Sequence, residues 1–492
     1  MNTIENGTDF QTPEQITAAY FESIKDNHAA LRQFFTAMPK GGDIHNHLTG
    51  AAYAETYFEL AADKGMYVDL ATGKLYKEAP ADIETIQLSK DMDDLHNKRM
   101  TLIDKWSIRN FEPYKYPLGP DEYFFGTFGL LSALTSLSDY DDDDSLENLA
   151  YLMYDLKARA VNENVQYLEV IGIAPNIPEY CFLSKNDYEK YDKKLKDIVK
   201  SGDYIGVHPL LTEILSLLMN SKDAQNASNK YLDAIYKLED KSEKISKKRH
   251  IDTSNVVCRY QGYTVRGLEP LMVFAQLYVV NRACSNDKGK LLTGCNIVAA
   301  EDGEKSMLYY ELHMNMFVSM SIFHTKTSLH AGELTLGLVR PEYMKDHVQY
   351  AVAIGSDRIG HGVDIPFEKD SKSTMKLMKK ERKPIPIEIN LTSNEFILGV
   401  KGSEHPITLY HEFGIPVIIS TDDPGILRTS LTEQYALAAL RYGFSYKEIK
   451  EFVYNSIKYS FLTDEEKTTQ TNKLQDLFSE FELIFTQKLS CQ

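Results

Sequence analysis

Histidine and carboxylate side chains recur at the ends of short apolar runs in this chain. In chain order these residues are His45, His47, His330, Glu333, His361, Asp422 and Asp423. Residues two apart in a strand point to the same side, so His45 and His47 can bind one ion together. Imidazole and carboxylate ligands suit zinc, and a catalytic zinc keeps one position open for water. Together these seven residues predict a catalytic zinc site.

Each segment taken alone also has a structural explanation. A single histidine at the end of a strand is usually a hydrogen-bonded structural residue, and Asp-Asp-Pro is common in turns and at helix N-caps. The combination favours the functional interpretation. Buried carboxylates and imidazoles cost stability unless they have partners, and such a set on one face of a protein therefore points to a use.

The elements that must position these residues are short apolar runs, each followed by a longer helical pattern. The runs span residues 42–47, 165–174, 255–261, 296–301, 327–333, 358–363, 386–392 and 416–422, with 204–210 as a rival for the third. Strands that alternate with helices imply a parallel sheet. Eight units predict an α/β fold of the (β/α)8 TIM-barrel type, whose chemistry lies at the carboxyl ends of the strands.

Segments outside this alternation predict additions to the barrel. Residues 1–37 form the predicted N-terminal helical extension, and 38–492 form the barrel, with insertions near 60–145 and 201–252. The acidic run 139–144 is interpreted as a solvated turn before a helix rather than a calcium site. The basic run 244–250 is interpreted as a solvated helix face. Trp106, the only tryptophan, anchors the first insertion or stacks near a ligand.

Charge and cysteine content indicate which classes of binding partner and which cellular compartment to expect. A net charge of −17 argues against nucleic acid or an anionic membrane as a partner, and leaves neutral small molecules open. The five cysteines have no CxxC spacing, which fits a reducing compartment. The N-terminal 15 residues lack the pattern of a secretory signal, and no run approaches the roughly 20 apolar residues that span a bilayer. A cytoplasmic location is therefore expected, unless a signal has already been removed.

The motifs carry a resemblance to a known family. MPKG before His-x-His, SLHAGE at 328–333, IGHGVD at 359–364 and STDDPGI at 420–426 resemble the adenosine deaminase family of the metal-dependent amidohydrolases. The match runs in order from about residue 38 to 460 and includes IEINLTSN at 387–394. MPKG, the long N-terminal segment and ISTDDP are most similar to the adenosine deaminase-related growth factor branch.

The resemblance implies one zinc ion per chain and a role for each residue. The implied zinc ligands are His45, His47, His330 and Asp422. Glu333 would carry the proton to purine N1, which must be protonated as attack at C6 breaks the ring conjugation. His361 would orient the attacking water, and Asp423 would contact N7. Because N7 offers only a lone pair, Asp423 must be protonated, and we expect burial and Asp422 to raise its pKa.

Three positions bear on the substrate rather than the reaction. Thr49 stands where family members commonly carry an aspartate that binds a ribose hydroxyl, so sugar recognition here lacks charge assistance. By the resemblance, Ala299 stands where the family has a glycine that contacts purine N3, and Asn296 stands where the family has an aspartate. Gly332 completes the predicted substrate contacts.

The resulting functional hypothesis is an enzyme, a zinc-dependent adenosine or 2′-deoxyadenosine aminohydrolase of purine nucleoside metabolism. Alternatives are a deaminase of adenine or another 6-aminopurine, and a non-catalytic, receptor-binding homologue. AMP is disfavoured because no basic cluster lies near the strand ends. A binuclear site is disfavoured because the fourth run ends in Val-Ala-Ala-Glu-Asp and offers no bridging lysine. The apolar face of residues 12–37 is compatible with a homodimer.

Overall fold

The computed structural model describes residues 11–490, with side chains up to residue 487. Residues 1–10 lie outside it, and with them the start of the predicted extension and most of the stretch that was judged free of a secretory signal. Cys491 also lies outside the described residues.

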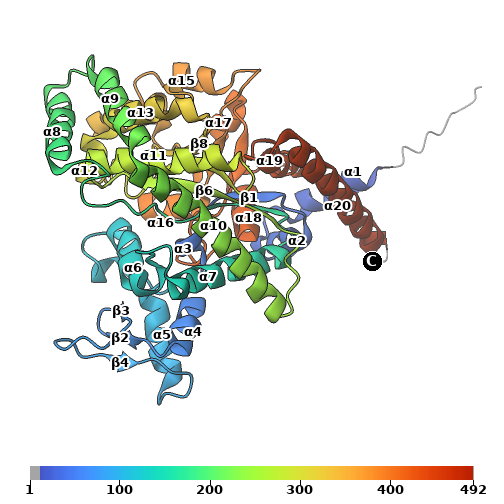
Figure 1. The fold of residues 1–492 in the computed structure, drawn as a ribbon. Coiled ribbons are helices and arrows are strands. Elements are labelled where there is room, and N and C mark those ends of the chain that lie inside the picture. The colour runs from blue at the N-terminus through green and yellow to red at the C-terminus, as the bar shows by residue number, and fades with distance from the viewer. Residues whose placement is uncertain (1–10, 491–492) are drawn as a thin grey trace, which may run out of the picture.

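Eight parallel strands form the centre of the molecule (Figure 1). They are β1 Gly42–His47, β5 Tyr167–Ile171, β6 Val257–Val265, β7 Leu292–Val298, β8 Lys326–Ala331, β9 Arg358–His361, β10 Ile387–Ile389 and β11 Val417–Ile419. The barrel closes next to the predicted site, where Asp422 N donates to His45 O and His47 N donates to Asp422 O, both at 2.9 Å. Each of the eight predicted runs overlaps one strand, so the predicted (β/α)8 barrel is confirmed.

The strands are buried because helices cover the outside of the barrel and side chains fill its interior. All five residues of β5 and all three of β10 and β11 are buried. After β6 the covering helices are α11 Pro270–Asp287, α12 Glu304–Leu308, α13 Tyr310–Ser319, α14 His347–Ala353, α15 Ser371–Met378, α16 Leu391–Leu398, α17 Ile407–Phe413, α18 Leu431–Tyr442 and α19 Tyr446–Lys458.

The N-terminal helices pack against the C-terminal end of the chain. The helices involved are α1 Pro13–Ile24, α2 His28–Ala37 and α20 Asp464–Ser490. Phe34 packs edge-on against Phe481 and Tyr446, with ring centroids 5.3 and 5.9 Å apart, and Phe35 stacks on Tyr435 at 6.0 Å. The apolar face that was compatible with a homodimer is thus covered within the chain. This covered face therefore does not support a homodimer, and the homodimer stays a prediction.

The segment between β1 and β5 contains five helices and a small sheet. The helices are α3 Leu48–Ala51, α4 Ala54–Asp63, α5 Leu95–Lys105, α6 Pro120–Thr135 and α7 Asp143–Asn162. The antiparallel sheet, which the sequence did not predict, consists of β2 Tyr67–Val68, β3 Leu75–Tyr76 and β4 Ile86–Gln87. Trp106 is fully buried and its Nε1 donates to Gly73 O at 2.7 Å. It anchors this segment.

Two charged runs behave as expected. Asp142 accepts a hydrogen bond from Ser145 N at 3.1 Å and caps α7, so the acidic run is a turn that starts a helix. The basic run ends α10, and its Lys and Arg side chains are exposed. The segment between β5 and β6 contains α8 Lys185–Ser201, α9 Val207–Asn220 and α10 Lys222–Lys248. Helix α10, which lies in the predicted insertion 201–252, packs against α7 and α11 and therefore belongs to the outer helical layer. The predicted division of the chain into an N-terminal extension and a barrel with two insertions stays a prediction.

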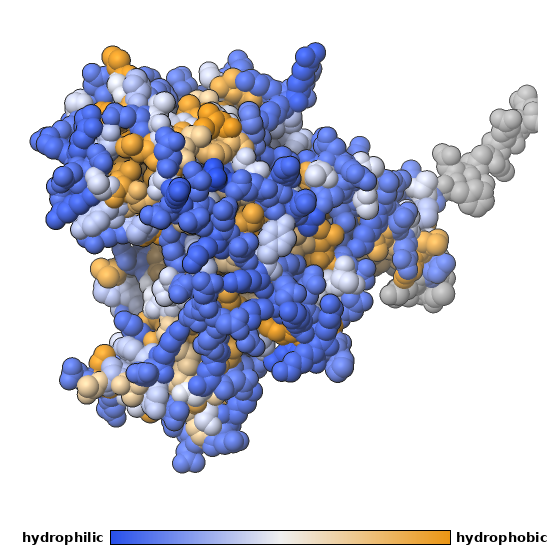
Figure 2. Space-filling model, in the orientation of Figure 1, coloured by the Kyte–Doolittle hydropathy of each residue, from blue (hydrophilic) through white to orange (hydrophobic). Residues whose placement is uncertain are grey.

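The surface on the face drawn in Figure 2 is mostly hydrophilic, with apolar areas gathered in its upper part, in the region of α9 and α13. None of the described helices is long and apolar enough to cross a membrane. The four described cysteines are buried and unpaired.

Candidate functional site

The four predicted metal ligands meet at the carboxyl ends of β1, β8 and β11. His330 Nε2 lies 3.1 Å from both His45 Nε2 and His47 Nε2. Asp422 Oδ1 lies 3.2 Å from His47 Nε2 and 3.5 Å from His45 Nε2. A tetrahedral ion with ligands at about 2.0–2.1 Å has its ligand atoms about 3.3–3.4 Å apart. These distances fit one zinc-sized ion held by three imidazoles and a carboxylate.

Three residues at the strand ends adopt a left-handed backbone conformation that favours glycine. The φ angles are +67° for His361, +65° for Asp422 and +83° for Ala299. Such a conformation costs of order 1–3 kcal/mol per residue and persists only where the surrounding structure enforces it. Two of these residues were predicted to act in the reaction, and the third replaces a family glycine.

The imidazoles of two predicted ligands are each oriented by a hydrogen bond at Nδ1. His45 Nδ1 donates to Glu388 Oε2 at 2.7 Å, and His330 Nδ1 donates to Asn296 Oδ1 at 2.9 Å. Each bond fixes the ring tautomer and leaves Nε2 free to bind a metal. The sequence had drawn attention to Asn296 only as a departure from the family. Here it accepts the hydrogen bond that orients His330.

A buried hydrogen-bonded chain connects these two supports through the barrel interior. Arg358 pairs with Glu388 and with Glu169, and the pKa of Arg358 is raised although burial opposes it. Gln261 Nε2 donates to Glu169 Oε1 at 2.8 Å, and Asn296 Nδ2 donates to Gln261 Oε1 at 3.2 Å. Sequence reasoning missed these residues. The available signal was a polar side chain in the middle of a buried apolar run, as in Tyr-Leu-Glu-Val-Ile at β5.

Glu333 lies beside the predicted ligands and is buried. Its Oε1 is 3.4 Å from His361 Nδ1 and has no hydrogen-bond partner among the described residues. Burial and then the charge of Asp422 raise the pKa of Glu333 well above its ordinary value. Both causes favour the protonated form of this carboxyl group, which is the form that can donate a proton.

The backbone that carries Glu333 is held by a second buried carboxylate. Glu301 accepts hydrogen bonds from Gly332 N at 3.1 Å and Glu333 N at 2.9 Å. Arg266 lies 3.6 Å from Glu301 and donates to His330 O at 2.6 Å. Arg266 and Glu301 thus hold the backbone of residues 330–333, which connects the predicted ligand His330 to the predicted proton carrier Glu333. Gly332 was predicted to contact the substrate, but its N–H is already bound to Glu301.

The tautomer of His361 follows from a chain of hydrogen bonds. Ile407 N donates to His405 Nδ1 at 3.2 Å, so the proton of neutral His405 is on Nε2, which donates to Asn394 Oδ1 at 3.0 Å. The Asn394 amide then donates to His361 Nδ1 at 3.0 Å. Burial lowers the pKa of His361 to about 3, so its ring is neutral. Its hydrogen is consequently on Nε2, a buried atom without a hydrogen-bond partner in the described chain.

Asp423 is buried beside Asp422, and its Oδ1 has no partner among residues 11–487. Burial and then the charge of Asp422 raise the pKa of Asp423 well above its usual range. This is the direction predicted from the sequence, and it favours the protonated form of Asp423, which can donate a hydrogen bond. Gly50 makes room for this carboxyl group, because a Cβ there would lie only 1.5 Å from Asp423 Oδ1.

A cavity of about 410 Å³ opens onto this group of residues. It is lined by His47, Thr49, Phe124, Phe125, Phe128, Tyr263, Val265, Val298, Ala299, Ala300, His330, Glu333, Ile397, Asp422 and Asp423. Thr49 and Ala299, both predicted substrate contacts, face this cavity, whereas Gly332 is not among its lining residues. Within the described chain, none of the lining residues is Lys or Arg.

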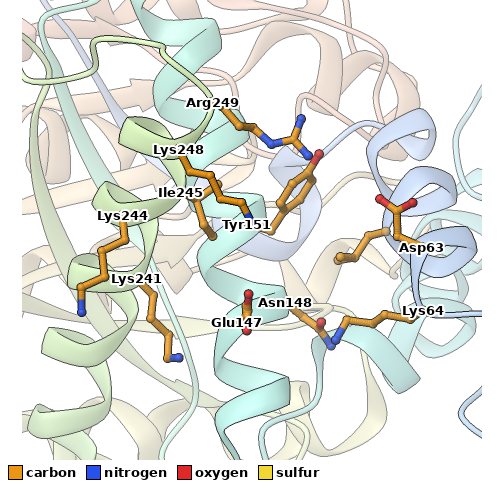
Figure 3. Close-up of a pocket in the computed structure, with 11 residues that line it drawn as sticks. Asp63, Lys64, Glu147, Asn148, Tyr151, Lys241, Lys244, Ile245, Lys248 and Arg249 are labelled. Atoms are coloured by element: carbon orange, nitrogen blue, oxygen red, sulfur yellow. The ribbon is translucent and has the colours of Figure 1, made fainter.

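A larger cavity of about 690 Å³ shares no lining residue with the first and lies between α4, α7 and α10 (Figure 3). Its cations are mostly neutralised: Lys64 pairs with Asp144 and Lys241 with Asp143, at 2.8 Å for the second pair. Arg249 stacks over the ring of Tyr151, 4.8 Å from its centroid, as the close-up shows. None of its described residues belongs to a group that could hold a metal ion.

Comparison with known sequences finds the adenosine deaminase family. The family model, described as adenosine deaminase, matches residues 252–477, which contain β6 to β11. An adenosine deaminase of Enterococcus faecalis is 32% identical over 152 residues, which cover 31% of this chain and 41% of that protein. One of Aliivibrio fischeri is 30% identical over 188 residues, covering 38% and 53% respectively. The chain spans about half the length of these curated relatives, or less.

Solved structures share the fold over most of the chain. The N6-mAMP deaminase of Arabidopsis has a TM-score of 0.54 at 18% identity and covers 90% of this chain and 99% of its own. An amidohydrolase of Burkholderia ambifaria with bound Zn has a TM-score of 0.55 at 17% identity, with 97% of both chains covered. An adenine deaminase of Arthrobacter aurescens has a TM-score of 0.52 at 15% identity, with 89% and 98% covered.

At these identities the structural likeness concerns the fold. The matched sequence segment contains His330, Glu333, His361, Asp422 and Asp423, whereas His45 and His47 precede it. The growth factor branch stays a prediction. The family model, the curated relatives and the barrel together make the chain similar to the adenosine deaminase family.

Proposed function

We propose that the protein is a zinc-dependent purine deaminase that converts adenosine or 2′-deoxyadenosine to the 6-oxopurine nucleoside and ammonia. The observation that carries the proposal is the tetrahedral spacing of His45, His47, His330 and Asp422 beside the buried Glu333, whose pKa is raised. In this proposal the four ligands hold one zinc ion. When bound, zinc lowers the pKa of a water molecule from 15.7 to about 7 and so makes water nucleophilic at neutral pH.

Glu333 acts as the proton carrier in this proposal. Addition of water at C6 turns a planar aromatic carbon into a tetrahedral one, which requires that N1 gains a proton as the conjugation breaks. The raised pKa of Glu333 keeps a proton available. Water supplies the new oxygen and two hydrogens. One hydrogen ends on N1 through Glu333, and the other leaves with the amino group as ammonia.

His361 and Asp423 act as hydrogen-bond donors. The tautomer of His361 directs its Nε2–H toward the reacting oxygen, where it can stabilise the charge that develops there. The protonated Asp423 donates to N7 and thereby orients the purine, so that C6 faces the ligand set and N1 faces Glu333. Neither role requires His361 to accept a proton.

The cavity supports an uncharged substrate. A phosphate group is bound in proteins by cations or by helix N-termini, and the described lining contains no Lys or Arg. The Arabidopsis structures in complex with IMP and GMP show nucleotides bound in that protein. A free base such as adenine is the second candidate, because Thr49 provides no charged partner for a sugar hydroxyl.

The test combines metal analysis with substrate turnover. Purified protein is loaded with zinc, its zinc content is measured, and the ultraviolet change is followed with adenosine, 2′-deoxyadenosine, adenine and AMP. We expect about one zinc per chain, turnover of the nucleosides and none of AMP. If the zinc-replete protein turns over none of the four, the proposed function is wrong.

A further inference from the structure

The cavity between α4, α7 and α10 carries an excess of positive charge, although the chain as a whole has a net charge of −17. Its volume of about 690 Å³ lies in the range of about 300–1,000 Å³ that is usual for small-molecule sites. The charged residues that line it are Asp63, Lys64, Glu147, Lys241, Lys244, Lys248 and Arg249. Five cations thus share the wall with two carboxylates, and such a local excess can attract an anion against the mean field of the protein.

Lys248 and Arg249 are the cations of this cavity that no carboxylate neutralises within the described chain. The ion pairs of the wall involve the other three cations, Lys64, Lys241 and Lys244. A helix C-terminus favours cations in its last turn, which accounts for the charge of Lys248 but not for its direction. Figure 3 shows its side chain extending from α10 into the space between α10 and α7. An anion in this space therefore meets an unpaired ammonium group.

Arg249 is held in place by aromatic rings. Its guanidinium carbon lies 4.8 Å from the ring centroid of Tyr151 and 5.6 Å from that of Tyr154, both on α7. A guanidinium that stacks on a ring keeps its N–H groups in its own plane, where they can still donate to an oxyanion. The planar fork of an arginine and the point charge of a lysine both suit phosphate oxygens. Because Lys248 and Arg249 line the same cavity, they can bind one phosphate group together.

Glu147 on α7 offers a different kind of contact. Its side chain is exposed, and its carboxylate forms no hydrogen bond or ion pair with the described residues. It lies four residues before Tyr151, a step of about 6 Å along the helix axis, which is the scale of one sugar ring. A carboxylate repels an anion but accepts charge-assisted hydrogen bonds from hydroxyl groups. A ligand that satisfies both contacts has a phosphate at one end and hydroxyl groups at the other.

We propose that this cavity binds a phosphorylated sugar, with the phosphate held by Lys248 and Arg249 and a sugar hydroxyl donating to Glu147. The second carboxylate of the wall, Asp63, is already paired with Lys90 and does not oppose the phosphate. Leu60 and Ile245 add apolar surface for the carbon skeleton. This site is separate from the proposed deaminase site, because the two cavities share no lining residue. The binding therefore does not depend on the proposed function.

The experiment is isothermal titration calorimetry of the zinc-loaded protein at low ionic strength, with ribose 5-phosphate, ribose and inorganic phosphate as probes. We expect one ribose 5-phosphate per chain with a Kd of about 0.1–1 mM, the strength of a few charge-assisted hydrogen bonds. Ribose and inorganic phosphate should each bind about tenfold more weakly, because each lacks one set of contacts. Absence of binding, or equally tight binding of inorganic phosphate, overturns the inference. Displacement of ribose 5-phosphate by saturating inosine also overturns it, because the probe then occupies the deaminase cavity.

Three substitutions test the two ends of the probe. Lys248→Gln should weaken ribose 5-phosphate about tenfold, since a charged partner of the phosphate is lost. Lys247→Gln makes the same charge change at an exposed neighbour that does not line the cavity, and should change the Kd less than about twofold. Equal effects of these two would indicate a diffuse field instead of a site and overturn the inference. Glu147→Ala should abolish the preference for ribose 5-phosphate over inorganic phosphate, and a retained preference would contradict the hydroxyl contact.

Discussion

The two ends of the site cavity are built on opposite principles. At the metal end, two of the predicted ligands and the predicted proton carrier are held by a further buried group: His45 by Glu388, His330 by Asn296, and Glu333 by Glu301 at its backbone. The other end of the cavity is lined by apolar side chains without directional bonds; this end, called the mouth, consists of Phe124, Phe125, Phe128, Val265, Val298 and Ile397. Hydrogen bonds fix angles, and apolar contacts do not. The proposed reaction is thus confined to one geometry at the metal end, whereas the mouth imposes no directional constraint.

The two ends also stand on different elements. The metal end lies on β1, β8, β9 and β11, whose register is fixed by hydrogen bonds to neighbouring strands. The mouth lies largely on α6, in the long segment between β1 and β5, and on α16. Rigid strands hold a catalytic geometry better than connecting segments do, and connecting segments vary more readily. Changes at the metal end should therefore alter the reaction, and changes at the mouth should alter the substrate.

The largest expected effect comes from removal of a ligand. His330→Ala deletes an imidazole that lies 3.1 Å from both His45 and His47, so we expect loss of zinc and of activity by several orders of magnitude. Zinc analysis and the deamination rate measure both. His411→Ala, which removes a histidine bonded to Glu448, is the control and should retain zinc and rate. Retention of zinc with full activity by His330→Ala would show that the ion binds elsewhere.

Glu333→Gln separates proton transfer from metal binding. The amide keeps the size of the carboxyl group but cannot deliver a proton to N1, and general acid catalysis contributes about 10²–10⁴-fold. We expect kcat to fall by that factor with zinc content and KM little changed. Single-turnover kinetics with adenosine measure kcat. A variant that keeps kcat but raises KM would assign Glu333 to substrate binding instead.

Asn394→Asp tests the tautomer of His361. The new carboxylate replaces a donor to His361 Nδ1 by an acceptor, which favours Nδ1–H and takes the hydrogen away from Nε2. Loss of one such donor to a developing charge costs about 10²–10³-fold in kcat. We expect a loss of that order with zinc retained. Nitrogen chemical shifts of the His361 ring report the tautomer, and an unchanged tautomer with a slower reaction would contradict this explanation.

Gln261→Leu breaks the buried chain at a residue that contacts no predicted ligand. Gln261 connects Glu169 with Asn296, so its loss frees the amide that orients His330. Outer partners of metal ligands change affinity by about 10–100-fold, and we expect the lower end of this range for a residue one step further away. Chelator competition measures the zinc affinity. Gln434→Leu, another fully buried glutamine bonded to Thr429, should leave it unchanged.

The sequence predicted the barrel and the metal end because both leave local signals. Buried parallel strands read as apolar runs, and His45-Asn-His47 has a spacing that only a strand turns into a pair of ligands. The supporting groups leave weaker signals. Glu169 and Gln261 meet only when distant strands become neighbours, which depends on the closed ring rather than on local pattern. The apolar mouth likewise depends on how α6 packs over the strand ends.

The smallest effect is expected at the boundary of the two ends, where Ala299 lines the cavity with φ at +83°. For a residue with a Cβ, a left-handed conformation costs roughly 1–2 kcal/mol, and glycine avoids this cost while losing more backbone entropy on folding. We expect Ala299→Gly to raise the free energy of unfolding by up to about 1 kcal/mol, measured by urea denaturation. Ala300→Gly, at a neighbour without a positive φ, should lower it. If both substitutions destabilise the protein equally, Ala299 is not strained. If only Ala299→Gly stabilises the protein, the methyl group of Ala299 costs stability. Its role is then to narrow the cavity between the mouth and the metal end.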